Sequence, residues 1–146
     1  MQVTGNVTVG TGASLVIGLN STIAGHITAK GCNFVGLVSE GNEEVDGNVQ
    51  ILGCTGNPSF LSPGNFSAIY GNLQCLNNTG PCSLESAIVG GSVQFMNNVS
   101  VSGSLNKLEA NQISRNLQCQ SNNPAPTNGG SVNTVAGSKQ GQCVGL

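Results

Sequence analysis

The strongest constraint on the fold is a six-residue pattern that recurs along the whole chain. It consists of an aliphatic residue, any residue, Gly, a polar residue, an aliphatic residue and then Thr or Gln, with Arg115 in place of the Gly in the sixth copy. Successive copies are offset by 20, 22, 24, 20, 24 and 22 residues. A short period across a whole chain is typical of a solenoid, in which each repeat packs on its neighbours.

Polar and apolar residues alternate after each Gly, which predicts short β-strands. Three apolar columns are expected to point inward: Val3, Ile23, Val45, Ile69, Val89, Ile113, Val135; Val7, Ile27, Val49, Leu73, Val93, Leu117; and Val9, Ala29, Ile51, Cys75, Phe95, Cys119. The sequence therefore predicts an all-β, single-domain parallel β-solenoid (β-helix) over residues 1–146, with about six coils of 20–24 residues. Right-handed winding is the default for parallel crossovers.

The Gly of each repeat marks a corner where a coil is expected to start. The coils start near Gly5, Gly25, Gly47, Gly71, Gly91 and Arg115, with a partial terminal coil from Gly137. Between the repeats we expect a second strand and a loop of variable length, including a turn-rich bulge at Asn57–Gly64. Leu105–Ile113 is the only segment with helical potential.

Charge and hydropathy exclude several classes of protein. Charged residues make up 7% of the chain, and the formal net charge is −2. Four scattered Lys and Arg residues cannot neutralise a nucleic acid or an anionic membrane. No apolar run approaches the ~20 residues that a spanning helix needs. Because Met1–Gly5 already lies in the repeat and resembles no signal peptide, we expect a processed form, an excised fragment or a chain whose leader lies upstream.

Six cysteines in a short, weakly charged chain favour an oxidising compartment. There is no Cys-x-x-Cys pair and only one His, so the spacing does not suggest metal or any cofactor. Cys32 and Cys54 each lie seven residues past the Gly of their own coil, which would stack them about one ~4.8 Å strand spacing apart. Cys75 and Cys82 can close a short loop within one coil. Cys119 and Cys143 would join the last full coil to the partial one. The expected disulfides are Cys32–Cys54, Cys75–Cys82 and Cys119–Cys143, with buried free thiols as the alternative.

Three C-terminal segments stand out beside the Gly-Asn-Val/Leu-Gln repeats: Asn116–Gln120, Asn123–Thr127 and Gly137–Cys143. With these features, essentially the whole chain resembles an uncharacterised group of bacterial secreted β-solenoid repeat proteins, and the C-terminal segments carry the specific part of the likeness. The resemblance implies a solenoid and secretion, supports the Cys119–Cys143 pair, and implies no active site. Arg115, Cys75 and Cys82 depart from the group's pattern.

Two columns of uncharged polar residues are expected to point outward. They are Asn6, His26, Asn48, Asn72, Ser92, Asn116, and Thr8, Thr28, Gln50, Gln74, Gln94, Gln118. Such an array could form hydrogen bonds with carbohydrate hydroxyls. It could also bind an ice lattice, but less well, because Thr is replaced by Gln after the second coil. The candidate ligand face consists of Asn48, Gln50, Asn72, Gln74, Gln94, Asn116 and Gln118. The alternative is that these amides form ladders along the stack and only keep the face soluble.

The titratable residues form no catalytic pattern. The carboxylates are Glu40, Glu43, Glu44, Asp46, Glu85 and Glu109. Four of them share one loop, which lacks the alternating ligand spacing of a dedicated Ca²⁺ site, so we expect a solvated acidic turn. His26 is expected at the surface without a Ser or Cys partner. We therefore expect no catalysis, because glycan-cleaving chemistry needs clustered acids.

Five Asn-x-Ser/Thr sequons are possible glycosylation sites in a eukaryotic or archaeal secretory pathway. They begin at Asn6, Asn20, Asn65, Asn77 and Asn98.

The ends of a solenoid present unpaired strand edges unless they are capped. Lys139 and Cys143 are expected to blunt the C-terminal end, whereas Val3–Val7 is a standard repeat without such a cap. Either a cap belongs to a segment that is missing from this sequence, or another subunit docks at the N-terminal edge. Head-to-tail docking at such an edge grows into filaments. The sequence thus predicts a secreted or cell-surface structural protein that self-associates through its N-terminal edge, end to end, into extracellular filaments. A glycan-binding solenoid is the alternative, and an enzyme ranks third.

Overall fold

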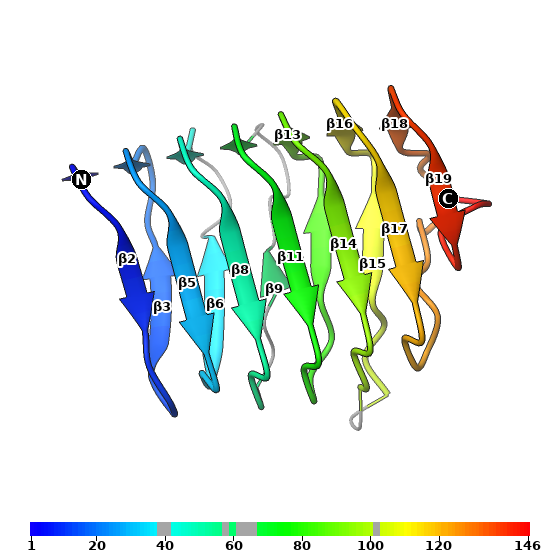
Figure 1. Ribbon diagram of the computed structural model, residues 1–146, viewed down its shortest axis with the longest axis horizontal. Helices are drawn as coiled ribbons and strands as arrows, with labels where there is room; N and C mark the ends of the chain where they lie inside the picture. Colours follow the sequence, from blue (N-terminus) through cyan, green and yellow to red (C-terminus); the bar gives the residue numbers. More distant parts are fainter. Residues whose placement is uncertain (38–41, 57–58, 61–66, 101–102) are drawn as a thin grey trace.

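The computed structural model describes residues 1–37, 42–56, 59–60, 67–100 and 103–146, and its regular elements are all β-strands. Figure 1 shows them as a stack of coils that advances from the N-terminus at one end to the C-terminus at the other. In that view the near strands β2 (Val7–Val9) and β5 (Ile27–Lys30) run downward and the more distant β3 (Ser14–Ile17) and β6 (Phe34–Leu37) run upward. The chain therefore winds as a right-handed parallel β-solenoid of about six turns.

Two seven-stranded parallel sheets run the length of the stack. The first contains β1 (Gln2–Val3), β4 (Thr22–Ile23), β7 (Glu44–Val45), β10 (Ala68–Ile69), β13 (Ile88–Val89), β16 (Gln112–Ile113) and β18 (Thr134–Val135). The second contains β2, β5, β8 (Val49–Leu52), β11 (Leu73–Leu76), β14 (Val93–Met96), β17 (Leu117–Gln120) and β19 (Lys139–Gly141). We call the second one the long sheet, because most of its strands have four residues.

A third side is formed by two smaller parallel sheets. One pairs β3 with β6, and the other contains β9 (Ser59–Phe60), β12 (Ser83–Glu85) and β15 (Lys107–Glu109). The segment Leu105–Ile113, the only candidate for a short helix, is therefore not helical and contains β15 and β16 (Gln112–Ile113). Its alternating residues Lys107, Leu108 and Glu109 pair in register with β12, and Leu108 is buried beside Leu84.

The three predicted inward columns form the core. Ile23, Val49 and Phe95 are at most 1% exposed, and the equivalent residues of the neighbouring coils are equally buried. The register aligns each column from coil to coil, as in Val49, Leu73 and Val93. Only the first and last coils leave members of these columns partly open, namely Val3, Val7 and Val135. Each coil thus covers the apolar face of the next, which is the expected source of stability.

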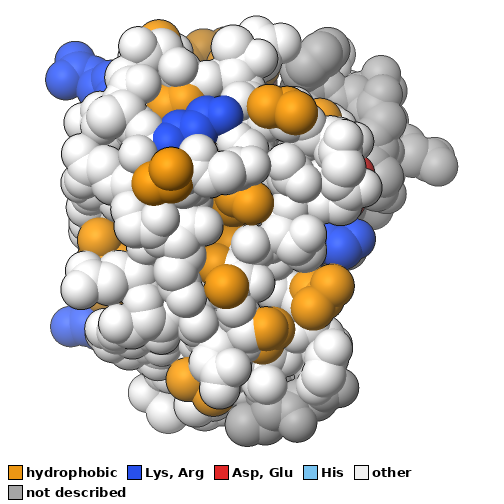
Figure 2. All heavy atoms as spheres, turned by 90° about the vertical axis from the view of Figure 1, so that its right-hand side faces the viewer, with side chains coloured by type: hydrophobic (Ala, Val, Ile, Leu, Met, Phe, Trp, Pro, Cys, Tyr) orange, Lys and Arg blue, Asp and Glu red, His pale blue; other side chains and the backbone are white. Residues whose placement is uncertain are grey.

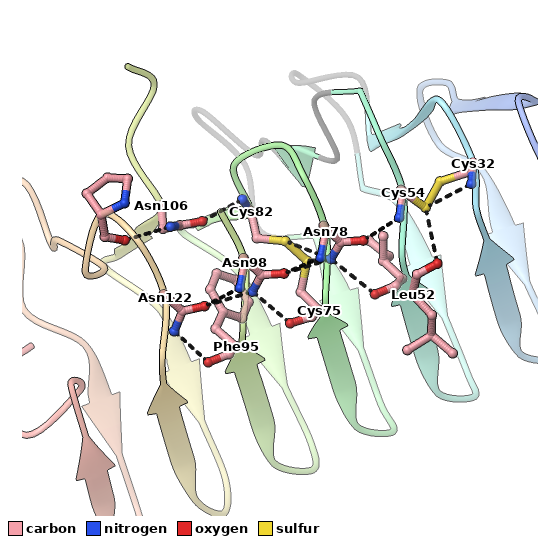
Figure 3. Close-up of a disulfide and its surroundings, with 12 residues drawn as sticks. Cys32, Leu52, Cys54, Cys75, Asn78, Cys82, Phe95, Asn98, Asn106 and Asn122 are labelled. Atoms are coloured by element: carbon pink, nitrogen blue, oxygen red, sulfur yellow. Dashed lines mark hydrogen bonds between the residues drawn. A yellow bond between two sulfur atoms is a disulfide. The ribbon is translucent and has the colours of Figure 1, made fainter. Parts of the chain in front are cut away.

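A corner of each coil follows the long sheet, where one residue has a positive φ and the next points inward. These positions hold, in order, Cys32, Cys54, Asn78, Asn98, Asn122 and Gln142, of which Gln142 in the last coil is exposed and the others are buried. In each case the backbone N–H of one coil donates to the side chain of the next: Cys32 N–H to Cys54 Sγ at 3.2 Å, Cys54 N–H to Asn78 Oδ1 at 2.7 Å, and so on to Gln142. We call this row the corner ladder; Figure 3 shows its course.

The asparagines of the corner ladder are almost fully hydrogen-bonded although they are buried. Asn98 is 0% exposed, and its Nδ2 donates to Cys75 O at 2.8 Å and to Asn122 Oδ1 at 2.9 Å. A second short ladder joins Asn111 to Asn133, whose Nδ2 groups donate to Leu84 O and Leu108 O. Buried amides are tolerated because each one satisfies backbone groups of two coils.

The second ladder occupies the same column as Ser21, Glu43 and Ser67 of the earlier coils. Glu43 was expected in a solvated acidic turn, but it is 1% exposed, and Ser67 Oγ donates to its Oε2 at 2.9 Å. The prediction failed because this position turns inward in every coil, whatever residue occupies it. Glu40 lies outside the described residues, as does most of the expected bulge at 57–64.

Candidate functional site

The two predicted outward columns border a groove along the long sheet. One hollow of about 380 Å³ is lined by Asn48, Gln50, Asn72, Gln74, Ser92 and Gln94. A second of about 260 Å³ is lined by Asn6, Thr8, His26, Thr28, Asn48 and Gln50. Because the hollows share Asn48 and Gln50, they form one open channel along the solenoid axis. We call it the polar groove.

One wall of the polar groove is a ladder of glutamines. Gln50 Nε2 donates to Gln74 Oε1 at 2.7 Å, and the same bond joins Gln74 to Gln94 at 2.7 Å. The ladder continues through Gln118 to Gln140, with distances of 2.7 and 2.8 Å. The register of the long sheet places these side chains directly above one another, so the ladder follows from the repeat spacing. The expected alternative of stacked amides is therefore present.

The other wall accepts hydrogen bonds from the backbone of the next coil. His26 N–H donates to Asn6 Oδ1 at 2.8 Å, and Asn48 N–H donates to Nδ1 of His26 at 2.9 Å. The same bond runs from Asn72 N–H to Asn48 Oδ1 and from Ser92 N–H to Asn72 Oδ1, each at 2.8 Å. The imidazole of His26 thus takes the place of an Asn side chain and acts as an acceptor.

The corner under this wall is tightly packed, which explains its glycines. A Cβ at Gly71 would lie 2.6 Å from both Gly47 O and Asn48 Oδ1. The Gly91 N–H donates to Gly71 O at 2.9 Å. Arg115 replaces Gly in the sixth coil, and among the described residues no equivalent bond joins Arg115 N–H to Gly91 O. The corner bond recurs on the next coil, where Gly137 N–H donates to Arg115 O at 3.0 Å.

None of the residues that line the polar groove is an Asp, Glu, Lys or Arg. Glu85 pairs with Lys107 at 3.7 Å on the third side, and Tyr70 Oη donates to Glu44 Oε1 at 3.5 Å. No group of three His, Cys, Asp or Glu side chains gathers as metal ligands in the described parts of the chain. The chemistry available in the groove is hydrogen bonding by neutral amides, hydroxyls and one imidazole.

All six cysteines form the pairs expected from the repeat register. The Cα–Cα distances are 4.4 Å for Cys32–Cys54, 6.5 Å for Cys75–Cys82 and 5.2 Å for Cys119–Cys143. Each cysteine is at most 1% exposed. The first pair bridges neighbouring coils, the second closes a loop within one coil, and the third ties the last coil to the stack. Three disulfides are compatible with an extracellular or otherwise oxidising environment.

The sequons differ in accessibility. Asn6, Asn20 and Asn77 are exposed, whereas Asn65 lies outside the described residues. Asn98 is buried in the corner ladder, so its assignment as a glycosylation site was wrong. A glycan on this amide would not fit between two stacked coils. The sequon motif reports local sequence only, and the inward direction of Asn98 comes from the corner geometry.

The corner ladder was missed at the sequence level, although a signal for it exists. Asn78, Asn98 and Asn122 recur at offsets of 20 and 24 residues, the same steps as the six-residue pattern in these coils, and Gln142 follows 20 residues later, where the pattern advances by 22. The preceding residues Asn77, Asn97 and Ser121 all have positive φ. Their shared spacing with the repeat would have placed the three asparagines in one stacked column.

The two ends of the stack differ. At the N-terminal end β1, β2 and β3 each pair on one side only, and Val3, Val7 and Leu15 are partly exposed there. At the C-terminal end residues 142–146 form a turn in which Leu146 N–H donates to Cys143 O, and Lys139 Nζ donates to Leu146 O. Figure 2 shows this end, with Lys and Arg side chains among small separate apolar patches.

The described part of the chain has no apolar helix long enough to cross a membrane. Searches of protein-family models, of curated proteins and of solved structures find no match to this chain. Its function is therefore argued from its own geometry.

Proposed function

We propose that this chain is a secreted or cell-surface structural protein, without catalysis, that assembles end to end through its N-terminal edge. The structure supplies a disulfide-linked β-solenoid, which is the scaffold that such a role needs. Most of its recurring polar side chains bond one coil to the next, in the glutamine ladder, the corner ladder and the asparagine wall. Side chains used in this way favour a structural role. A secreted role is also what the resemblance of this chain to bacterial secreted β-solenoid repeat proteins implies.

One observation supports the assembly: among the described residues β1, β2 and β3 are each paired on one side only. In the asparagine wall each N–H donates to the side chain of the preceding coil, and Asn6 N–H has no preceding coil in the described chain. At the other end Ser138 Oγ closes the same column, where it donates to Asn116 Oδ1 and accepts from Gln140 Nε2. A hydroxyl has two acceptor lone pairs, so Ser138 retains capacity for Asn6 N–H of a second copy.

Head-to-tail docking also defines which residues meet. Val7 starts the column that ends at Lys139, because β2 pairs with β5 and β17 pairs with β19 in the same register. In an end-to-end assembly Val7 of one copy would lie beside Lys139 of the next, about one strand spacing (~4.8 Å) away. This contact allows a charge test.

The test is sedimentation velocity and electron microscopy of the full chain and three variants over a wide concentration range. Wild-type protein should form elongated particles that lengthen with concentration. Val7→Lys should weaken assembly, because it opposes the ammonium of Lys139, whereas Val7→Glu should retain it by forming an ion pair. Thr8→Lys, which adds charge on the outward side of the same strand, should have little effect.

Circular dichroism and thermal unfolding show that each variant is folded. A wild-type chain that stays monomeric at every concentration would contradict the proposed assembly. Equal weakening by Val7→Glu and Val7→Lys would contradict head-to-tail docking, since two N-terminal edges facing each other repel with either charge.

A further inference from the structure

The polar groove has the dimensions of a site for a chain-like ligand. Five successive coils each contribute one residue to either wall, from Asn6 and Thr8 to Ser92 and Gln94. The coils are spaced by about one parallel-strand distance, ~4.8 Å. The groove therefore presents one pair of uncharged side chains at each step along the axis, with Thr in the first two coils and Gln in the next three on one wall.

The glutamine ladder leaves a regular set of unused hydrogen-bonding groups. An amide has two N–H donors and an oxygen with two lone pairs. Gln74 uses one donor toward Gln94 and one lone pair toward Gln50. The second N–H and second lone pair have no partner among the described residues. One donor and one acceptor thus remain for a ligand at each ladder position.

These side chains are already held in place before a ligand arrives. Gln74 and Gln94 are each bonded to a glutamine on both sides and are half-buried. Immobilising a flexible side chain on binding costs conformational entropy, and these side chains are already ordered by the ladder in the folded protein. Hydrogen bonds from such fixed amides favour binding more than those from free surface glutamines.

Charge and spacing decide the class of ligand. The groove contains no carboxylate, Lys or Arg, so it offers nothing for a nucleic acid or an acidic polysaccharide. An extended peptide presents side chains on one face every ~6.6–6.8 Å, which does not match the coil step of ~4.8 Å. A β-1,4-linked hexose chain is uncharged, carries hydroxyls on every unit and advances by nearly one coil step per sugar.

We propose that the polar groove binds a neutral, linear β-1,4-linked polysaccharide that lies along the solenoid axis, with one sugar per coil. The free N–H and lone pair of each glutamine bond to the hydroxyls of one sugar, and the asparagine wall borders the opposite edge of the glycan. Because the two columns border a hollow and not a flat plane, the site does not fit an ice surface. This inference is independent of the end-to-end assembly.

The experiment is calorimetric titration of the full chain with oligosaccharides of increasing length. The arms are gluco-oligosaccharides with β-1,4 linkages, their N-acetylated chitin equivalents, α-1,4-linked malto-oligosaccharides and oligogalacturonate. Affinity for at least one β-1,4-linked series should rise with length until the five coils of the groove are filled. The comparison of the two β-1,4-linked series identifies the natural source of the glycan.

Gln74→Ala and Gln94→Ala should each weaken binding about 5- to 10-fold, because each removes hydrogen bonds to one sugar and breaks the ladder. Gln112→Ala is the matched control: Gln112 is exposed on β16, outside the groove, and its loss should leave binding unchanged. Thermal unfolding verifies the fold of each variant. Absence of binding by both β-1,4-linked series would overturn the proposal. So would equally tight binding of the α-linked or acidic series, or an equal loss with Gln112→Ala.

Discussion

The backbone N–H of Cys54 donates a 2.7 Å hydrogen bond to Oδ1 of Asn78, one coil further along the stack. Here the corner ladder changes from a disulfide to a run of asparagines. The N–H of Cys32 makes the equivalent bond to the sulfur of Cys54, and the N–H of Asn78 makes it to Asn98. Two different kinds of side chain thus satisfy the same backbone donor in successive coils, and the repeat tolerates both.

Removal of Asn98 should strongly destabilise the fold. Asn98→Ala leaves Asn78 N–H buried without its acceptor and removes the side-chain donor to Cys75 O, and a buried group left unsatisfied costs about 1–3 kcal/mol. We expect a loss of about 2–5 kcal/mol in the free energy of unfolding, measured by urea denaturation. Asn116→Ala removes a similar acceptor from Ser138 N–H, but at an exposed position, and should cost less than about 1 kcal/mol. Equal losses would contradict the role of burial.

The glycine corners offer a matched pair of substitutions. Gly71→Ala places a Cβ 2.6 Å from Gly47 O, whereas Gly5→Ala in the first coil meets nothing within 4 Å. Overpacking of this kind costs about 1–3 kcal/mol. Gly71→Ala should therefore lower the midpoint of thermal unfolding by several degrees, and Gly5→Ala should leave it nearly unchanged. If both variants lower the midpoint of thermal unfolding by a similar amount, the neighbouring coil does not restrict the space for a Cβ at the corner.

The Cys32–Cys54 position tests whether asparagine can replace the disulfide in the corner ladder. Replacement of both residues by Ala removes a covalent link worth about 2–4 kcal/mol and also the acceptor for Cys32 N–H. The double variant Cys32→Asn with Cys54→Asn loses the link but restores the acceptors. We expect the free energy of unfolding of the double-Asn variant, measured by chemical denaturation, to exceed that of the double-Ala variant by about 1 kcal/mol or more. If the double-Asn variant is less stable than the double-Ala variant, these coils cannot accommodate asparagines in the corner ladder.

His26 occupies an asparagine position in the outward column, so His26→Asn should be tolerated. The Asn side chain accepts from Asn48 N–H as Asn48 itself accepts from Asn72 N–H. We expect a change within about 0.5 kcal/mol, compared with a loss of about 0.5–1.5 kcal/mol for His26→Leu, which has no acceptor. If the two variants unfold at the same denaturant concentration, the bond from Asn48 N–H does not contribute.

The fold and the Cys32–Cys54 disulfide could be predicted because a single period determines both. Once Val7, Ile27 and Val49 are aligned by the pattern, Cys32 and Cys54 fall on neighbouring coils without further information. The same period places Gln50, Gln74 and Gln94 in one column, so the glutamine ladder was foreseen as an alternative to a ligand face. The groove between the two walls was not, because its depth depends on the corner at each Gly.

The failed predictions lie at positions whose direction depends on corner geometry. Glu43 and Asn98 are polar residues in sequence contexts typical of loops, and both point into the stack. Leu108 was placed in a possible helix because its neighbours favour no single structure, and pairing with Leu84 decides in favour of a strand. In each case a contact between residues far apart in sequence outweighs the local preference.

The most direct test of the stacked register is an NMR measurement of nuclear Overhauser effects within the long sheet. The structure aligns Gln50, Gln74 and Gln94 directly above one another, with bonded side-chain amides. The account predicts contacts from the side-chain amide of Gln74 to those of both Gln50 and Gln94, together with slow exchange of the Leu73 backbone amide. Contacts from Gln74 only to residues close in sequence, with rapid exchange at Leu73, would contradict the solenoid and everything inferred from it.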